Sequence, residues 1–168
     1  YIQEATSFEP GKEAVSKHHW VIYRYAETLL TYAESMVNAF NDVNYTDETY
    51  KYSALWAINE VRKNADMPLI PSMGKDEFME RLYNEWRVEF AFEDHRFWDI
   101  RRWLIADDEG VMKGAMYGLQ LSAVTGAPGK VHYKPYVFEN RLWSDRSYLH
   151  PIKQTEIDKG YMLQNPGW

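Results

Sequence analysis

Hydrophobic residues make up 45% of this chain of 168 residues, which excludes a disordered chain and is enough for one domain with a buried core. The net charge of −6 at pH 7 argues against nucleic-acid binding, because no excess of basic side chains is present to neutralise phosphates. Without cysteine the chain contains neither a disulfide nor a thiolate metal site, and no apolar run reaches the roughly 18 residues that cross a bilayer.

The first 20 residues show no sustained periodicity and contain Pro10 and Gly11, so we expect them to form a loop. His18 and His19 are adjacent and therefore point to different faces of any regular element. They do not predict a metal site, and no metal or cofactor is expected elsewhere in the chain.

The clearest helical pattern covers residues 21–40. Its apolar stripe is formed by Tyr25, Leu29, Met36 and Phe40, with Ala26, Leu30, Ala33 and Val37 beside them. Asp47 is expected to N-cap a second helix that runs to about residue 65. The buried side of this second helix is predicted to contain Tyr50, Ala54, Ile58 and Val61. Pro68 and Pro71 follow and end it.

A third helical pattern begins at Lys75 and leads into the densest stretch of charge and aromatic rings, residues 84–103, NEWRVEFAFEDHRFWDIRRW. One apolar stripe is formed by Phe78, Leu82, Trp86 and Phe90. Glu85, Glu89 and Glu93 fall in the same arc of the helix. Burial of an ionised carboxylate on such a stripe costs on the order of several kcal/mol, unless a cation pairs with it.

The second half of this stretch offers such cations. On a shorter helix, Phe97, Ile100 and Leu104 share a face with Arg101, and Arg96 and Arg102 lie close by. The stretch therefore predicts a helix, a bend and a second helix, whose packed side carries a network of carboxylates and guanidinium groups.

The network has two interpretations. Paired carboxylates with a nearby histidine could perform general acid–base catalysis. Arginine side chains in such number, however, keep carboxylates ionised, which suits a structural network better than a general acid. We favour the structural interpretation, and we expect Glu89→Ala or Arg96→Ala to destabilise the protein by roughly 3–5 kcal/mol. Unchanged thermal stability of both variants would refute it.

After Leu104 the helical periodicity ends and glycines and proline punctuate the chain. Residues 131–138 and 141–143 are short β-type runs, and a hairpin over residues 126–129 is expected. Aromatic and apolar side chains are concentrated here: Met116, Tyr117, Tyr133, Tyr136, Phe138, Trp143 and Tyr148.

These rings also have two interpretations. Exposed rings could stack on the apolar face of a pyranose while polar neighbours bind its hydroxyl groups. Alternatively the rings cover the helical core, which is the interpretation we favour. The candidate ligand contacts in this region are Tyr117, Tyr136 and Trp143.

Three ordered stretches match one family. They are residues 24–34 (RYAETLLTYAE), residues 84–103 and residues 148–168, which end in QNPGW. Within 84–103 the matching residues are Asn84, Glu85, Arg87, Glu89, Ala91, Phe92, Glu93, Arg96, Asp99, Arg102 and Trp103. Residues 54–68 (ALWAINEVRKNADMP) add a weaker match. Together these motifs resemble the SusD/RagB family of outer-membrane nutrient-binding proteins.

The chain departs from the family pattern at a few positions. Trp86 stands where a second arginine is usual, and Asp94 stands where glycine is usual. Aspartate tolerates the left-handed backbone conformation that ends a helix, so the bend can survive this substitution. In the C-terminal motif Lys153 replaces a usual proline and Gly160 a usual asparagine.

The resemblance implies an all-α (mainly α) fold, a tetratricopeptide-like α–α stack with irregular and short β segments in the C-terminal part. We expect a single SusD/RagB-like C-terminal domain over residues 1–168, with a helical core at 21–104 and an irregular, aromatic-rich region at 105–168. Because the chain has neither an initiating methionine nor a signal peptide, we expect it to be a processed piece. Whole members of the family are about three times longer.

The resemblance further implies a surface-exposed outer-membrane lipoprotein of a Bacteroidota-type bacterium, held by an N-terminal lipid anchor that this chain lacks. Such proteins capture nutrients, usually glycans, and pass them to a SusC-like TonB-dependent transporter without catalysis. Most ligand contacts of the family lie before the RYAE motif. Two alternatives remain open: a helical-repeat module that binds proteins or peptides, and a glycoside hydrolase that uses two of Glu85, Glu89 and Glu93.

Overall fold

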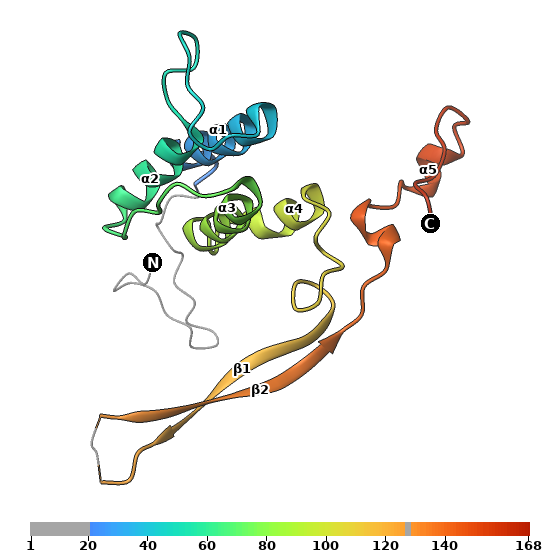
Figure 1. The fold of residues 1–168 in the computed structure, drawn as a ribbon. Coiled ribbons are helices and arrows are strands. Elements are labelled where there is room, and N and C mark those ends of the chain that lie inside the picture. The colour runs from blue at the N-terminus through green and yellow to red at the C-terminus, as the bar shows by residue number, and fades with distance from the viewer. Residues whose placement is uncertain (1–20, 127–128) are drawn as a thin grey trace. The chain divides into compact units, whose positions relative to one another are not determined.

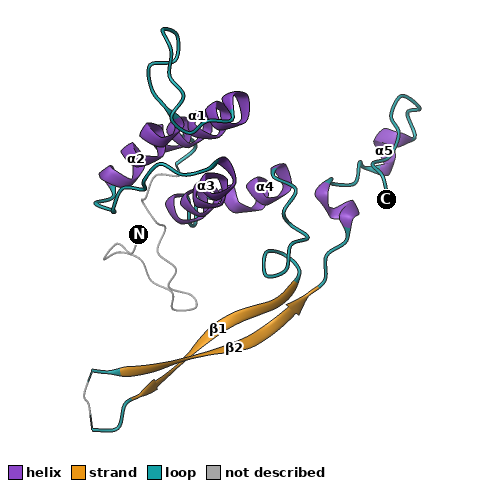
Figure 2. Ribbon diagram, in the orientation of Figure 1, coloured by secondary structure: helices purple, strands orange, loops and turns teal. Residues whose placement is uncertain are grey.

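The computed structural model describes residues 21–126 and 129–168. The chain divides into two compact units, Tyr1–Glu93 and Asp94–Trp168, called unit 1 and unit 2 below. Helices predominate among the described residues, and a two-stranded sheet lies in unit 2 (Figures 1 and 2). The predicted mainly α fold class is therefore confirmed. The expected N-terminal loop and the His18–His19 pair lie outside the described residues.

Unit 1 contains three helices: α1 (Tyr25–Phe40), α2 (Ala54–Asn64) and α3 (Lys75–Glu89). Helix α1 packs against both α2 and α3, as Figure 1 shows. The largest fully buried side chains of this unit are Leu30, Val37, Ile58, Phe78 and Leu82. Burial of apolar side chains of this size contributes about 1.5–3 kcal/mol each, so this core dominates the stability of the unit.

Helix α1 begins four residues later than its pattern predicts. Arg24 is the N-cap residue in an extended conformation, and Asn41 ends the helix with φ 55°, the left-handed conformation that asparagine adopts readily. The predicted stripe is buried from Leu29 to Val37. Tyr25 was expected on this stripe but is 69% exposed, because it occupies the first residue of the helix, one turn before the buried stripe begins.

Helix α2 does not begin after Asp47, so this part of the prediction is wrong. The Asp47 carboxylate accepts hydrogen bonds from the backbone N–H groups of Thr49 and Tyr50, and the bond from Tyr50 is the main cause that lowers the pKa of Asp47. Asp47 thus closes a turn, an alternative use of a capping residue. Ser53 caps the helix instead, accepting from the Trp56 N–H at 3.1 Å. Tyr50, expected on the buried side of α2, lies before the helix and is exposed.

The long third helix agrees closely with its prediction. It begins at Lys75, and Phe78, Leu82, Trp86 and Phe90 are all buried. The chain leaves the helix after Glu89, and Asp94 has φ 63°, which confirms the left-handed residue expected at the bend.

Unit 2 opens with α4 (His95–Arg102), in which Asp99 and Ile100 are buried. The expected face shared by Phe97, Ile100 and Leu104 is not formed, since Phe97 and Leu104 are exposed. Leu104 lies beyond the end of the helix and has φ 56°, so the helical spacing on which the prediction relied no longer applies there.

The sheet is an antiparallel hairpin of β1 (Gly114–Ala123) and β2 (Val131–Arg141), with an irregularity in register between Met116 and Tyr117. The predicted hairpin around residues 126–129 is confirmed. The separate β run expected at 141–143 is wrong, because Arg141 is the last residue of β2 and the next two residues lie outside the strand.

The C-terminal segment contains the short helices η1 (Asp145–Tyr148) and α5 (Gln154–Ile157). The Gln164 side chain bonds both backbone groups of Ile152, accepting from its N–H at 2.8 Å and donating to its carbonyl at 2.9 Å. The Trp168 indole N–H donates to the carbonyls of Arg146 and Leu149. The QNPGW ending thus folds back on the segment before it and satisfies backbone groups there.

Candidate functional site

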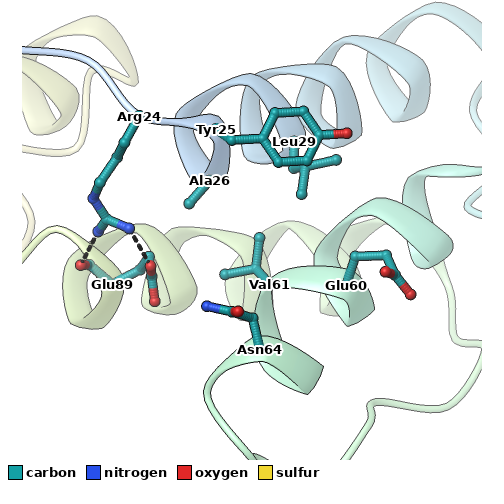
Figure 3. Close-up of a pocket in the computed structure, with 8 residues that line it drawn as sticks. All are labelled: Arg24, Tyr25, Ala26, Leu29, Glu60, Val61, Asn64 and Glu89. Carbon is teal, nitrogen blue, oxygen red and sulfur yellow. Dashed lines mark hydrogen bonds and ion pairs between the residues drawn. The ribbon is translucent and has the colours of Figure 1, made fainter.

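A pocket of about 360 Å³ lies in unit 1 beside the first turn of α1. Figure 3 shows its lining: Arg24, Tyr25, Ala26, Leu29, Glu60, Val61, Asn64 and Glu89. The side chains of Ala26, Leu29 and Val61 supply apolar surface, whereas Glu60 and Asn64 supply a carboxylate and an amide. An exposed ring, an apolar lining and a few polar groups are typical of a site that binds a small ligand.

Arg24 joins this pocket to the carboxylates that the sequence singled out. Its guanidinium donates to Glu89 Oε1 at 2.5 Å and to Glu93 Oε2 at 2.8 Å, and it lies 4.4 Å from the centre of the Phe90 ring. Burial by itself would lower the pKa of Arg24, but the hydrogen bonds to Glu93 and Glu89 outweigh it and raise that pKa. The hydrogen bonds from one guanidinium group to two carboxylates are charge-assisted, and they fix the position of both carboxylates.

The third carboxylate has its own arginine. Glu85, which is buried, accepts from Arg62 Nη1 at 2.6 Å, and Arg62 Nε donates to the Pro68 carbonyl at 2.8 Å. No role for Arg24 or Arg62 was predicted from the sequence. Both arginines belong to motifs that were recognised in the sequence, RYAE and NEVR. Their pairing partners are distant in sequence, so helical spacing alone could not identify them.

The three arginines expected in the network all lie in α4. Arg101 donates to the carbonyls of Phe97 and Ser147, and its guanidinium lies 3.6 Å from the Phe97 ring centre. Arg102 lies 3.4 Å from Asp99 Oδ1, and Arg96 is half-buried. The common structural role of Glu85, Glu89, Glu93, Arg96, Arg101 and Arg102 stays a prediction.

The three candidate ligand contacts are not on one surface. In the hairpin, Tyr136 is paired with Gly118, the neighbour of Tyr117, so the rings of Tyr117 and Tyr136 lie on opposite faces. Trp143 is half-buried and packs edge-on against Tyr148, with ring centres 5.0 Å apart. A single sugar ring therefore cannot contact all three, and their assignment to ligand binding stays a prediction.

No described helix is both long and apolar enough to pass through a bilayer. Within residues 21–126 and 129–168, no group of three or more histidine, aspartate or glutamate side chains is placed to hold a metal ion.

Comparison with known proteins gives a family. The SusD family model matches residues 1–168. The chain belongs to the SusD family. A SusD-like protein of Bacteroides fragilis has a similar solved structure, with 29% identity and a TM-score of 0.70 over 89% of this chain. A SusD superfamily protein of Parabacteroides distasonis is 21% identical, with a TM-score of 0.56 over 89% of this chain, which supports the fold alone.

The matched part is 26% of the Bacteroides fragilis chain and 27% of the Parabacteroides distasonis chain, so this SusD-family chain spans about a quarter of either relative's length. No curated protein sequence matched it.

Three of the matching stretches, residues 24–34, 54–68 and 84–93, meet in unit 1. Arg24 of the RYAE motif binds Glu89 and Glu93 of the NEWRVEFAFE motif, and Arg62 of the NEVR motif binds Glu85. Segments that are distant in sequence are thus joined by ion pairs of low solvent exposure. This arrangement gives the motifs a physical basis that does not require a chemical reaction.

Unit 2 contains a hydrogen-bonded pair of side chains, Asp107 and Tyr148, whose pKa values are both shifted. The Tyr148 hydroxyl donates to the Asp107 carboxylate and accepts from the Asp107 N–H at 3.2 Å. The hydrogen bond from Tyr148 lowers the pKa of Asp107, whereas burial and the same bond raise the pKa of Tyr148. Because the folded pKa of Asp107 is depressed, its contribution to stability is present above the unfolded pKa and is lost as pH falls through the folded pKa.

We therefore expect Tyr148→Phe to raise the pKa of Asp107 toward its ordinary value. A carboxyl-detected NMR titration of the two proteins measures this directly. The matched control is Tyr161→Phe, which removes another exposed tyrosine hydroxyl, bonded to Glu156. An Asp107 titration that is the same with and without the Tyr148 hydroxyl would contradict the assignment.

Proposed function

We propose that this SusD-family protein captures a nutrient at the outer surface of the outer membrane of a Bacteroidota-type bacterium, and that the nutrient is an oligosaccharide. It delivers the captured ligand to a SusC-like TonB-dependent transporter and does not change it chemically. The observation that carries this proposal is the match of the family model to the whole chain. The lipid anchor and the transporter contact belong to the same proposal.

The pocket of unit 1 supports a sugar ligand. Tyr25 stands at the pocket with a largely exposed ring, which can stack on the apolar face of a pyranose. Glu60 and Asn64 offer oxygen and nitrogen atoms that can hydrogen-bond hydroxyl groups. Affinity is expected to be modest, because a sugar gives up strong hydration on binding.

The ion pairs made by Glu85, Glu89 and Glu93 support ligand capture without catalysis. A glycosidase needs one protonated carboxyl group as its general acid and a second carboxylate as nucleophile or base. Glu89 and Glu93 are instead both bound by Arg24, and Glu85 by Arg62, so all three carboxylates are already engaged in ion pairs within the fold.

Calorimetric titration of the full-length protein with a panel of oligosaccharides and peptides tests the ligand class. We expect saturable binding of at least one oligosaccharide, and we expect Tyr25→Ala to weaken it about tenfold, the loss of a stacking contact worth about 1.4 kcal/mol. Tyr161→Ala, which removes a similarly exposed ring in unit 2, is the control and should leave the affinity unchanged.

Each outcome is informative. Binding of peptides and not of sugars would replace the oligosaccharide with a peptide ligand and would favour the helical-repeat interaction module. Sugar binding that is unaffected by Tyr25→Ala would keep the function but remove the pocket of unit 1 as its site.

A further inference from the structure

A second pocket lies in unit 1, with a volume of about 410 Å³. We call it the Trp56 pocket. Its walls include Trp56, Glu60 and Lys63 of α2 and Leu69 of the loop that follows this helix. It shares Glu60 with the pocket beside α1 that Figure 3 shows, so the two pockets are neighbours along α2.

Helical geometry places the two pockets on opposite flanks of Glu60. Val61 and Asn64 line the pocket beside α1, and at about 100° per residue both lie to one side of Glu60. Trp56 and Lys63 line the Trp56 pocket and lie to its other side. From Trp56 to Asn64 the helix rises about 12 Å, at 1.5 Å per residue. A ligand that contacts both ends is therefore longer than a monosaccharide.

The aromatic wall of the Trp56 pocket is held in place. The Trp56 ring stacks on the Tyr52 ring, with ring centres 4.2 Å apart and an angle of 26° between the planes. The Tyr52 carbonyl in turn accepts a hydrogen bond from the Tyr32 hydroxyl of α1 at 2.6 Å. A half-buried indole that is fixed in this way loses little conformational freedom when a ligand stacks on it.

The opposite wall is also formed without a ligand. The Asn59 side chain bonds both backbone groups of Ile70, donating to the carbonyl at 3.0 Å and accepting from the N–H at 2.9 Å. Arg62 donates to the carbonyl of Pro68 at 2.8 Å. These bonds pin the loop on both sides of Leu69, which is 60% exposed and lines the pocket. Pockets that bind small ligands are usually formed in advance in this way.

The polar groups of the Trp56 pocket suit a ligand with many hydroxyl groups. Glu60 and Lys63 approach each other at 3.9 Å, which is longer than a hydrogen bond, and their side chains are 38% and 72% exposed. The carboxylate can therefore accept bonds from hydroxyl groups and the ammonium can donate to them. An extended peptide is less suitable, because the α2 backbone is bonded within the helix and offers no strand edge.

We infer that the Trp56 pocket is a second sugar subsite, and that the ligand is an oligosaccharide whose rings occupy both pockets at once. Tyr25 stacks on a ring in the pocket beside α1, Trp56 stacks on a ring in the second pocket, and Glu60 bonds hydroxyl groups between them. This inference rests on the proposed function. It adds a minimum length for the ligand and makes Trp56 a residue that selects for that length.

The dependence of affinity on ligand length tests the inference. Malto-, xylo-, cello- and manno-oligosaccharides, from monosaccharide to hexasaccharide, are titrated into the full-length protein by calorimetry. For the series that binds, we expect affinity to rise with length. Trp56→Ala should weaken binding of the hexasaccharide about tenfold and leave the monosaccharide unaffected, whereas Tyr25→Ala should weaken both. Trp98→Ala, which removes an exposed indole in unit 2, is the matched control and should change neither affinity.

Lys63→Ala provides a second test of the same subsite, because this exposed side chain can be removed without loss of core packing. It should weaken hexasaccharide binding about threefold and leave the monosaccharide unaffected, the loss of a hydrogen bond to a charged group. Trp56→Phe should keep part of the affinity that Trp56→Ala loses, since a smaller ring can still stack.

The opposing outcomes separate the inference from the proposed function. Sugar binding that is independent of length, or that neither Trp56→Ala nor Lys63→Ala weakens, would overturn the second subsite and leave capture of a sugar intact. Equal weakening of the monosaccharide and the hexasaccharide by Trp56→Ala would make this pocket the primary site and would also overturn the inference. Absence of binding by every saccharide would overturn the proposed function itself.

Discussion

Replacement of Arg24 by alanine is expected to lower the free energy of unfolding by about 3 kcal/mol, the cost of leaving two largely shielded carboxylates without their partner. Arg24 binds both Glu89 and Glu93 and lies over Phe90, so its loss leaves one carboxylate at the end of α3 and one in the turn after it without this cation. Urea denaturation followed by circular dichroism gives the difference between the variant and the parent protein.

The control for this prediction is Arg81→Ala. Arg81 and Glu77 form an ion pair on the same helix, but both side chains are well exposed and the N–O distance is 3.9 Å. Its removal should cost no more than about 0.5 kcal/mol. Equal destabilisation by the two alanine substitutions would show that the pairing of Arg24 has no special structural weight. Arg24→Lys should recover only part of the loss, since an ammonium group cannot bond both carboxylates in the fork geometry.

Glu85 and Arg62 are expected to be coupled by about 2 kcal/mol in a double-mutant cycle. Glu85→Ala alone should destabilise by about 3 kcal/mol, because it leaves the half-buried guanidinium of Arg62 without its carboxylate. The double variant should not regain the parent stability, since Arg62 also satisfies the carbonyl of Pro68.

The Lys63–Glu60 pair on the same helix α2 provides the comparison. It is separated by 3.9 Å and is more exposed, so a coupling of less than about 0.5 kcal/mol is expected there. A coupling between Glu85 and Arg62 as small as this one would contradict their assignment as a buried structural pair.

Local sequence signals predicted much of the fold. The spacing of Phe78, Leu82, Trp86 and Phe90 defines the buried side of α3, because helical geometry alone brings these side chains to one face. The bend at Asp94 was predicted from the family resemblance, in which glycine is usual at this position, because aspartate also tolerates the left-handed conformation. The hairpin around residues 126–129 follows from its glycines and the β-type run after it.

Features that depend on tertiary contacts were harder to predict from the sequence. Asp47 and Ser53 are both capable of capping a helix, and only the structure shows that Asp47 closes a turn while Ser53 caps α2. The pairing of Glu89 with Arg24, 65 residues away, depends on how α1 packs on α3. No helical spacing within one segment contains that information.

The candidate ligand contacts show the same limit in the sheet. Tyr117 and Tyr136 are both exposed aromatic residues of the hairpin, yet a change of one residue in register reverses the face on which each ring lies. The irregularity beside Tyr117 could not be read from composition, so the sequence could nominate these rings but could not place them on a common surface.

We propose that the protein captures a glycan and does not cleave it. Extended calorimetric recording after injection of an oligosaccharide that binds to the full-length protein tests this claim most directly, because binding heat decays and turnover heat continues. We expect saturable heats that return to the baseline in the parent protein, and no continuing heat in Glu89→Gln, whose side chain also lines the pocket of unit 1. Continuing heat that disappears in Glu89→Gln would contradict the claim and would make the carboxylates of residues 85–93 catalytic.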